Sequence, residues 1–266
     1  MKKLLIIFSL ILAAGAAQAD SALKSFRTGD DSRGWEAVGR LDFAGRSFCT
    51  GTLITERLVL TAAHCMFDIY SKQAHQPNDV TFRAGWRNGQ AQAYRTAKAI
   101  YVHPGFSLAS DNLHDRLVND VALVELSLPV RNTSVRPFPT SVRPEKGQAV
   151  GVVSYAHDRA ESPSLQEVCH VMARQGGVLV TSCEVDFGSS GAPIFDMTGA
   201  VPRIVSVVSA KANFRGERVS VGTSLDGALA DLLQMAATGQ SRFKKVDAGP
   251  MPALTDTKFA LGLLGQ

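Results

Sequence analysis

Hydrophobic residues in the middle of the chain come in short runs of strand length, separated by polar residues and turn formers. These runs are rich in Val, Thr, Leu and Ile, which favour extended backbone and pack well on a pleated sheet. The body of the protein is therefore expected to be mostly β-structure. The runs predict strands within residues 47–55, 57–65, 79–86, 120–126, 148–155 and 203–210.

A helical period appears only near the end of this region. The stretch "SLDGALADLLQMAATG", residues 224–239, repeats apolar residues every three or four positions, and Gly239 is a plausible stop. One C-terminal α-helix is predicted, with a single apolar face that consists of Leu225, Ala228, Leu229, Leu232 and Leu233.

A Pro-rich stretch, "LPVRNTSVRPFPTSVRP", divides the predicted strands into two sets and is typical of a linker. Together with the two ends of the chain it gives four segments. They are a signal peptide (1–19), an N-terminal β-barrel (20–130), a C-terminal β-barrel with its terminal helix (131–239) and a C-terminal tail (240–266).

The N-terminus has the form of a cleavable signal peptide. Lys2 and Lys3 precede an apolar run, and Ala17-Gln18-Ala19 is a small-x-small cleavage site. The run is short for a transmembrane helix, which needs about 20 apolar residues. We expect a secreted or periplasmic protein that starts near Asp20 and has no membrane association after cleavage.

The net charge of +4 changes this picture little, because basic and acidic residues are mixed along the chain. There is no basic block and no aromatic-interleaved stripe of the kind that binds nucleic acid. The sequence predicts no nucleic-acid partner, no cofactor and a monomer.

The four cysteines fit an oxidising compartment, and they allow three pairings. Pairing neighbours closes two modest loops, and each bridge contributes about 3 kcal/mol by restricting the unfolded chain. Zinc is the competing interpretation, but neither a C-x-x-C pair nor a His pair at ligand spacing supports it. We propose the local disulfides Cys49–Cys65 and Cys169–Cys183, one in each half.

Three separated motifs suggest a nucleophilic site. "GSSG" places serines between glycines, "TAAHC" puts His64 at the end of an apolar run, and "NDVALVEL" puts Asp120 just before another. A serine hydroxyl needs a base to remove its proton, an imidazole suits that task, and a buried carboxylate fixes the imidazole tautomer. Asp111 and Asp115 are rivals for the carboxylate, but only Asp120 abuts the strand.

With "FCTGTLITERLVLTAAHC", "DVALVEL", "GSSGAP" and "RIVSVVS" in this order, the chain resembles the chymotrypsin/trypsin-like serine peptidases over most of residues 35–236. The compact "CEVDFGSSGAP" is more similar to bacterial, glutamyl-endopeptidase-like members than to digestive trypsins. The resemblance implies an all-β fold of two perpendicular six-stranded antiparallel β-barrels, followed by the α-helix. It also implies an endopeptidase that cleaves protein or peptide substrates through an acyl-enzyme intermediate.

The same resemblance implies the roles of individual residues. His64, Asp120 and Ser190 match the catalytic triad, and the N–H groups of Gly188 and Ser190 match the oxyanion hole. Ser206 matches the serine that supports the catalytic carboxylate and begins the substrate-binding strand. The expected pocket wall consists of Glu184, Val185, Ser206, Val207 and Val208. Because Val208 stands where the family usually has glycine, a narrow pocket for small or apolar side chains is favoured.

Two departures from the family pattern concern activation. Most trypsin-like members have Asp before the nucleophile, paired with a new N-terminus, whereas this chain has Ser189 and no R-I-V-G-G motif. We therefore expect activity that does not depend on that ion pair, although removal of a short pro-segment near Arg27 or Arg33 stays open. The alternative function is a catalytically silent binding or regulatory protein on the same scaffold.

Overall fold

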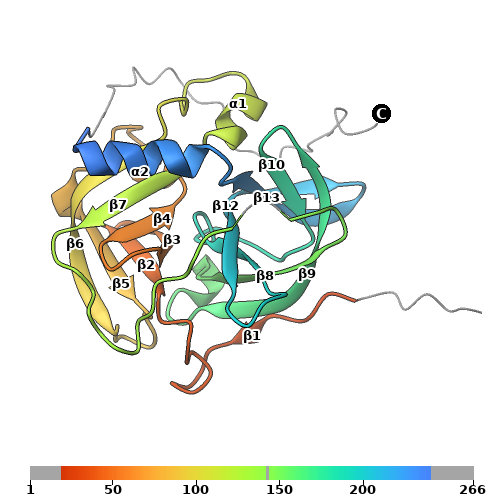
Figure 1. The fold of residues 1–266 in the computed structure, drawn as a ribbon, viewed down its shortest axis with the longest axis horizontal. Coiled ribbons are helices and arrows are strands. Elements are labelled where there is room, and N and C mark those ends of the chain that lie inside the picture. Colours follow the sequence, from red (N-terminus) through yellow and green to blue (C-terminus); the bar gives the residue numbers. More distant parts are fainter. Residues whose placement is uncertain (1–18, 142–143, 241–266) are drawn as a thin grey trace, which may run out of the picture.

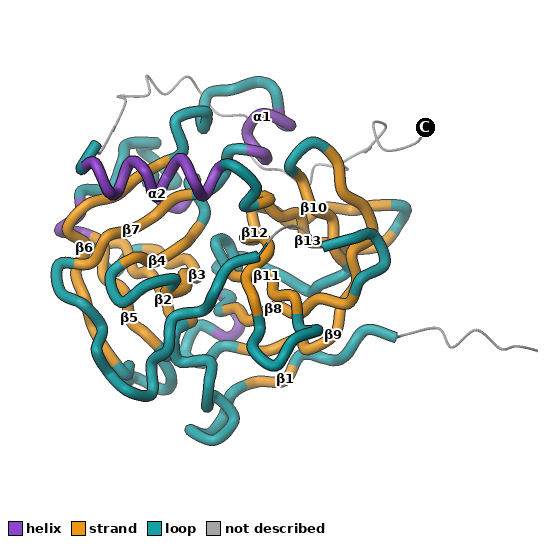
Figure 2. The backbone as a smooth tube through the Cα atoms, viewed as in Figure 1, coloured by secondary structure: helices purple, strands orange, loops and turns teal. Residues whose placement is uncertain are grey.

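The computed structural model describes residues 19–141 and 144–240. It contains two β-barrels that lie side by side, with β2 to β7 on the left and β8 to β13 on the right in Figure 1. Strands dominate both halves, and the helices lie at the periphery (Figure 2). Nearly all of the proposed signal peptide and of the proposed C-terminal tail lies outside the described residues.

The first barrel closes in the order β2-β3-β4-β7-β6-β5, and every neighbouring pair is antiparallel. Its interior is filled by inward-facing apolar side chains such as Leu41, Phe82 and Leu123. Its strands are β2 (Val38–Phe43), β3 (Ser47–Leu53), β4 (Leu58–Thr61), β5 (Val80–Ala84), β6 (Ala93–Val102) and β7 (Ala122–Leu126).

The second barrel runs β9-β10-β13-β12-β11-β8, and the β8–β9 pairing closes it. The fold is therefore the predicted pair of six-stranded antiparallel barrels with a C-terminal helix. The strands are β8 (Ala149–Ser154), β9 (Ser164–Gln175), β10 (Val178–Thr181), β11 (Pro193–Asp196), β12 (Arg203–Phe214) and β13 (Glu217–Ser224).

All six predicted strand regions contain strands, but seven further strands were not predicted. β6 shows why: its half-buried sequence "AYRTAKAIYV" interleaves charged and small residues, so it has no continuous apolar run. β9 is similarly mixed, with charged and polar residues along an otherwise apolar strand. Such strands owe their place to pairing on both sides rather than to local propensity.

Both ends of the described chain cross to the opposite barrel. β1 (Lys24–Ser25) pairs with β9 and thus extends the sheet of the second barrel, although the sequence had placed these residues with the first. Helix α2 (Ala228–Thr238) packs on β6 and β7 of the first barrel (Figure 1), although the sequence had placed it with the second. Each terminus therefore helps to fix one barrel against the other.

The C-terminal helix buries most of the face that the sequence predicted. Ala228, Leu229 and Leu232 lie in the core with residues of the first barrel, whereas Leu233 is partly exposed. The helix ends at Gly239, which adopts the left-handed conformation, as a C-terminal glycine cap should. The only other α-helix in the described ranges is the short α1 (Leu113–Val118), which leads the chain to Asp120.

Candidate active site

His64 and Asp120 are held together by two hydrogen bonds. His64 begins the short 3₁₀ helix η1 (His64–Met66), shortly after β4, while Asp120 stands just before β7. Because β4 and β7 are paired, the two residues come to the same end of the first barrel. The Asp120 carboxylate contacts His64 Nδ1 at 2.7 Å and accepts the His64 backbone N–H at 2.8 Å. This arrangement fixes the orientation of the ring.

Asp120 also bonds to the second barrel. Its side chain is buried, and its Oδ2 accepts a hydrogen bond from the hydroxyl of Ser209 on β12. A buried carboxylate is costly unless its oxygens are hydrogen-bonded, and here both oxygens have donors. Asp120 is thus a bridge between the two barrels.

The supporting serine is Ser209, and the prediction of Ser206 for this contact was wrong. The buried Ser206 hydroxyl donates instead to the carbonyl of Thr223 on the neighbouring strand β13, at 2.7 Å. An odd shift of three residues along a strand changes the face to which a side chain points. β12 also has a register irregularity between Val208 and Ala210, which reorients this part of the strand.

The pKa of His64 lies above its ordinary value of 6.5 as the result of opposing causes. Burial alone lowers the pKa of the imidazole, and the nearby positive charge of Arg116 acts in the same direction. The charge of Asp120 and its hydrogen bond raise the pKa by more than these effects lower it. The carboxylate therefore stabilises the imidazolium, the form that a general base becomes when it accepts a proton.

The two serines of the glycine-flanked loop occupy different environments. Ser189 is fully buried, and its hydroxyl donates to the Tyr155 carbonyl at 3.1 Å and accepts the Asp186 N–H at 3.3 Å. Ser190 is partly exposed, and its carbonyl accepts the N–H of Thr50 on β3 at 2.9 Å. Only the second serine therefore has a hydroxyl accessible to a substrate.

The backbone around Ser190 leaves two amide groups without a protein acceptor. The N–H of Ser189 donates to the Asp186 carbonyl, and the N–H of Gly191 donates to the Val208 carbonyl. Within the described ranges, the N–H groups of Gly188 and Ser190 donate to no carbonyl or side chain. Two unpaired donors, one on a serine and one two residues before it, can stabilise a developing oxyanion.

Glycine is required on both sides of the two serines. Gly188 has φ of +96°, and a Cβ there would lie 2.5 Å from the ring of Phe48. Gly191 has φ of +77°, and a Cβ there would lie 2.1 Å from Thr61 Oγ1. This close approach places the residue after Ser190 against the strand that leads to His64.

Of the hydrogen bonds among the described residues, none joins Ser190 Oγ to His64 Nε2. His64 Nε2 lies 3.8 Å from Cys65 Sγ. Catalytic hydrogen bonds are often long without substrate and tighten when it binds. The structure thus brings His64 and Asp120 into direct contact, and it places the loop of Ser190 against the same barrel edge.

Alanine at Gly191 is expected to reduce the free energy of unfolding by about 4 kcal/mol or more, because the new methyl group combines backbone strain with overlap against Thr61. Gly45 is the matched control, since its φ is +72° but no atom lies within 4 Å of an added Cβ. Gly45→Ala should cost only about 1–2 kcal/mol. Urea unfolding of both variants measures the difference, and equal losses would contradict the close packing.

The residues predicted to form the pocket wall are not all available to a substrate. The side chains of Ser206, Val207 and Val208 are buried within the protein core. Glu184 is exposed and Val185 is partly buried, both on the loop that leads to Ser190. The expectation of a narrow pocket depended on Val208, and the burial of its side chain removes that reason.

The sequence missed a group of charged and aromatic residues beside the nucleophile loop. Lys211 on β12 contacts Asp186 at 2.8 Å, and its Nζ lies 4.1 Å from the centre of the exposed Phe187 ring. The sequence does not indicate this group because Lys211 is 25 residues away from Asp186 along the chain. The contact ties the strand that follows Ser209 to the loop that precedes Ser190.

Both proposed disulfides are present, Cys49–Cys65 and Cys169–Cys183. The first joins β3 to the residue after His64 and so fixes the start of η1. In the described part of the chain, one group of side chains, Cys49, His64 and Cys65, is close enough to suggest a metal site. Both of its sulfurs are in the disulfide, which leaves them unable to act as thiolate ligands. None of the described helices is both long and apolar enough to cross a membrane.

Comparison with known proteins finds relatives in sequence. The family model described as Trypsin matches residues 28–229. Human kallikrein-15 is 30% identical over 197 residues, which is 69% of this chain and 71% of that protein. Human kallikrein-11 is 33% identical over 143 residues, which is 53% of this chain. The chain spans about half (47%) of the length of kallikrein-11.

Among solved structures, the fold is similar to that of a Glu endopeptidase in complex with MPD. The TM-score is 0.66 with 18% sequence identity, and the match covers 82% of this chain and 98% of the other. At this level of identity the likeness concerns the arrangement of the two barrels.

Proposed function

Because the chain belongs to the trypsin family, we propose that it is an exported serine endopeptidase whose catalytic triad is Ser190, His64 and Asp120. The observation that carries the proposal is the buried Asp120 carboxylate, which holds His64 by its ring and its backbone. The partly exposed Ser190 has an unpaired N–H of its own, and a second unpaired N–H belongs to Gly188. The site thus has a base in His64, a carboxylate that orients it in Asp120, and two N–H groups that can stabilise an oxyanion.

In the proposed reaction, Ser190 Oγ attacks the carbonyl carbon of a peptide bond while His64 Nε2 accepts the hydroxyl proton. The carbonyl oxygen becomes negative and is stabilised by the N–H groups of Gly188 and Ser190, each of which typically contributes about a hundred- to thousandfold in rate. His64 then gives its proton to the leaving amine as the C–N bond breaks. Water, activated by the same imidazole, hydrolyses the acyl-enzyme and restores the serine.

We also propose that the segment from Cys183 to Pro193 is of the compact, bacterial type, close in character to that of glutamyl endopeptidases. The short loop between Cys183 and Ser190 and the likeness in fold to a Glu endopeptidase support it. The pocket wall that we now propose consists of Glu184, Val185 and the strand from Ser209 to Lys211, in place of the buried residues that precede Ser209.

Export to the periplasm or the cell exterior is part of the proposal. The basic start, the apolar run and the Ala17-Gln18-Ala19 site support it, as do the two disulfides, because such bonds persist in oxidising compartments. The proposed partners are protein or peptide substrates, and the proposed oligomeric state is a monomer.

The decisive test is covalent labelling with a fluorophosphonate, followed by mass-spectrometric mapping of the modified peptide. We expect one adduct, on Ser190, and its loss after heat denaturation. Labelling of an activated serine requires the base and the oxyanion site but no knowledge of the natural substrate. An adduct on Ser189, or no adduct on the folded protein, would overturn the assignment.

A further inference from the structure

The segment of residues 20–26 lies along β9 as an additional edge of the second barrel. The N–H of Ser21 donates to the Val168 carbonyl, and the N–H of Val168 donates to Ser21 Oγ, both at 2.8 Å. β1 continues the pairing, and Phe26 behind it is only 1% exposed. At the outer end, His170 Nδ1 lies 2.8 Å from an oxygen of Asp20. This docked segment, defined here as residues 20–26, is thus fixed at both ends.

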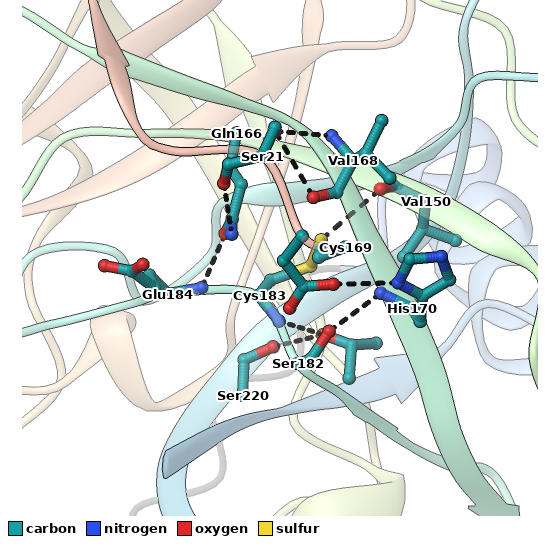
Figure 3. The surroundings of a disulfide bond; sticks show 12 residues. Ser21, Val150, Gln166, Val168, Cys169, His170, Ser182, Cys183, Glu184 and Ser220 are labelled. Atoms are coloured by element: carbon teal, nitrogen blue, oxygen red, sulfur yellow. Dashed lines mark hydrogen bonds and ion pairs between the residues drawn. A yellow bond between two sulfur atoms is a disulfide. The ribbon is translucent and has the colours of Figure 1, made fainter. Parts of the chain in front are cut away.

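One buried side chain connects the docked segment to the loop of the proposed nucleophile. Gln166 on β9 is only 1% exposed. Its amide nitrogen donates to the Ser21 carbonyl at 3.0 Å, and its amide oxygen accepts the N–H of Glu184 at 2.7 Å (Figure 3). A buried amide is favourable only when it is hydrogen-bonded, and here each end of the amide serves a different segment.

Glu184 begins the loop that ends at Ser190. The preceding residue, Cys183, is tied to β9 by the disulfide with Cys169, so Gln166 and the disulfide hold the entry of the loop from the same strand. Further along, the N–H of Ser189 donates to the Asp186 carbonyl, which closes the turn that leads to Ser190. A displacement at Glu184 would therefore be passed along a short, hydrogen-bonded loop.

Nothing charged is buried at Ser189 to fix this loop from the inside. The Ser189 hydroxyl makes two hydrogen bonds between neutral groups, to the backbone of Tyr155 and Asp186. The ion pair between Asp186 and Lys211 holds the middle of the loop at the surface, where both side chains are about half exposed. The buried contacts of Gln166 hold the other end of the loop.

We infer that Gln166 is a positioning residue, which couples the docked segment to the nucleophile loop and so holds Gly188 and Ser190 in their productive arrangement. The inference rests on the proposed peptidase function. It also means that residues 20–26 remain in the active protein, since cleavage near Arg27 or Arg33 would remove the segment that Gln166 binds. Activity would then not depend on an ion pair with a new N-terminus, because Gln166 and the docked segment support the nucleophile loop instead.

The test compares chains that begin at Asp20, with the rate of fluorophosphonate labelling of Ser190 as the readout. Gln166→Leu removes both contacts, whereas Gln166→Glu keeps an acceptor for Glu184 and loses the donor to Ser21. Deletion of residues 20–21 removes the other partner but keeps β1 and Phe26. Gln175→Leu, at the exposed end of the same strand, is the matched control.

We expect Gln166→Leu, Gln166→Glu and the deletion each to slow the covalent step by about 10- to 100-fold, since small misplacements of a nucleophile have effects of this size. The control should label as fast as the unchanged protein. Reversible binding of the probe should change by less than about threefold. A slower covalent step with nearly unchanged probe affinity is not what a general loss of folded protein would produce. Labelling is compared well below the unfolding midpoint of each variant.

Adding the deletion to Gln166→Glu should cause little further loss, because both changes break one connection. If Gln166→Leu fails to fold, the labelling rates of the deletion and of Gln166→Glu still test the positioning role of Gln166. Equal labelling rates in all variants would overturn the inference. It would also be overturned if the combined variant lost as much as the product of the losses from the deletion and from Gln166→Glu. Failure of the unchanged protein to label at Ser190 would instead overturn the proposed function itself.

Discussion

Replacement of Ser190 by alanine is expected to slow peptide cleavage by about 10⁶-fold, because no other accessible hydroxyl shares the loop with the two unpaired N–H groups. A mixed peptide library, with products identified by mass spectrometry, measures the loss and also reveals the preferred side chain. The variant should fold normally, since the backbone carbonyl of Ser190, which binds Thr50, is unchanged.

Ser189→Ala provides the matched control for this prediction. It removes a buried hydroxyl that donates to the Tyr155 carbonyl and accepts the Asp186 N–H, so it should reduce cleavage by at most about 30-fold, the effect of two lost neutral hydrogen bonds. Cleavage that survives in Ser190→Ala would indicate a contaminant or a different mechanism. A larger loss in Ser189→Ala than in Ser190→Ala would reverse the assignment of the two serines.

The strand runs were sufficient to predict a mostly β body because several strands have strong local signals, whereas the pair of barrels was predicted from the resemblance to the family. Val, Thr and Leu runs marked β3, β4, β7 and β8, and the period of the last apolar face marked α2. The position of the docked segment was not predictable. β1 consists of two residues with no apolar pattern, and its place depends on pairing Lys24 with Leu165, far away in the chain.

The sequence predicted the contact between His64 and Asp120 but misplaced the serine that supports it. Val205-Ser206 and Val208-Ser209 are the same dipeptide repeated three positions apart, so local composition cannot separate them. The choice is made by the register of β12, through one irregularity opposite the step from Ile194 to Phe195 and another between Val208 and Ala210. Such irregularities reorient side chains without a distinct sequence signature.

Asp120 has two tasks, because the same carboxylate that orients His64 also accepts the hydroxyl of Ser209 from the other barrel. Its position before β7 is on the first barrel, while the nucleophile loop and β12 belong to the second. The geometry of the proposed site therefore depends on how the two barrels meet. The crossing of β1 and α2 to opposite barrels fixes that contact.

Asp120→Asn is accordingly expected to lower the maximal rate of Ser190 labelling by about 10⁴-fold, as for the corresponding substitution in trypsin. The asparagine has nearly the same shape, but its amide no longer holds the imidazole in the tautomer that leaves Nε2 free to accept a proton. Asp115→Asn is the control, because Asp115 is exposed on α1 and should leave the labelling rate unchanged.

The pH dependence of labelling distinguishes a lost partner of His64 from a general disturbance of the site. Labelling requires the neutral imidazole, so in the unchanged protein the rate should rise with pH around a midpoint above 6.5, because Asp120 raises the pKa of His64. In Asp120→Asn that cause disappears, while burial and the charge of Arg116 still lower the pKa. The midpoint should therefore move to lower pH even as the maximal rate falls. A midpoint that stays in place or rises in Asp120→Asn would show that the carboxylate does not control the proton on this imidazole.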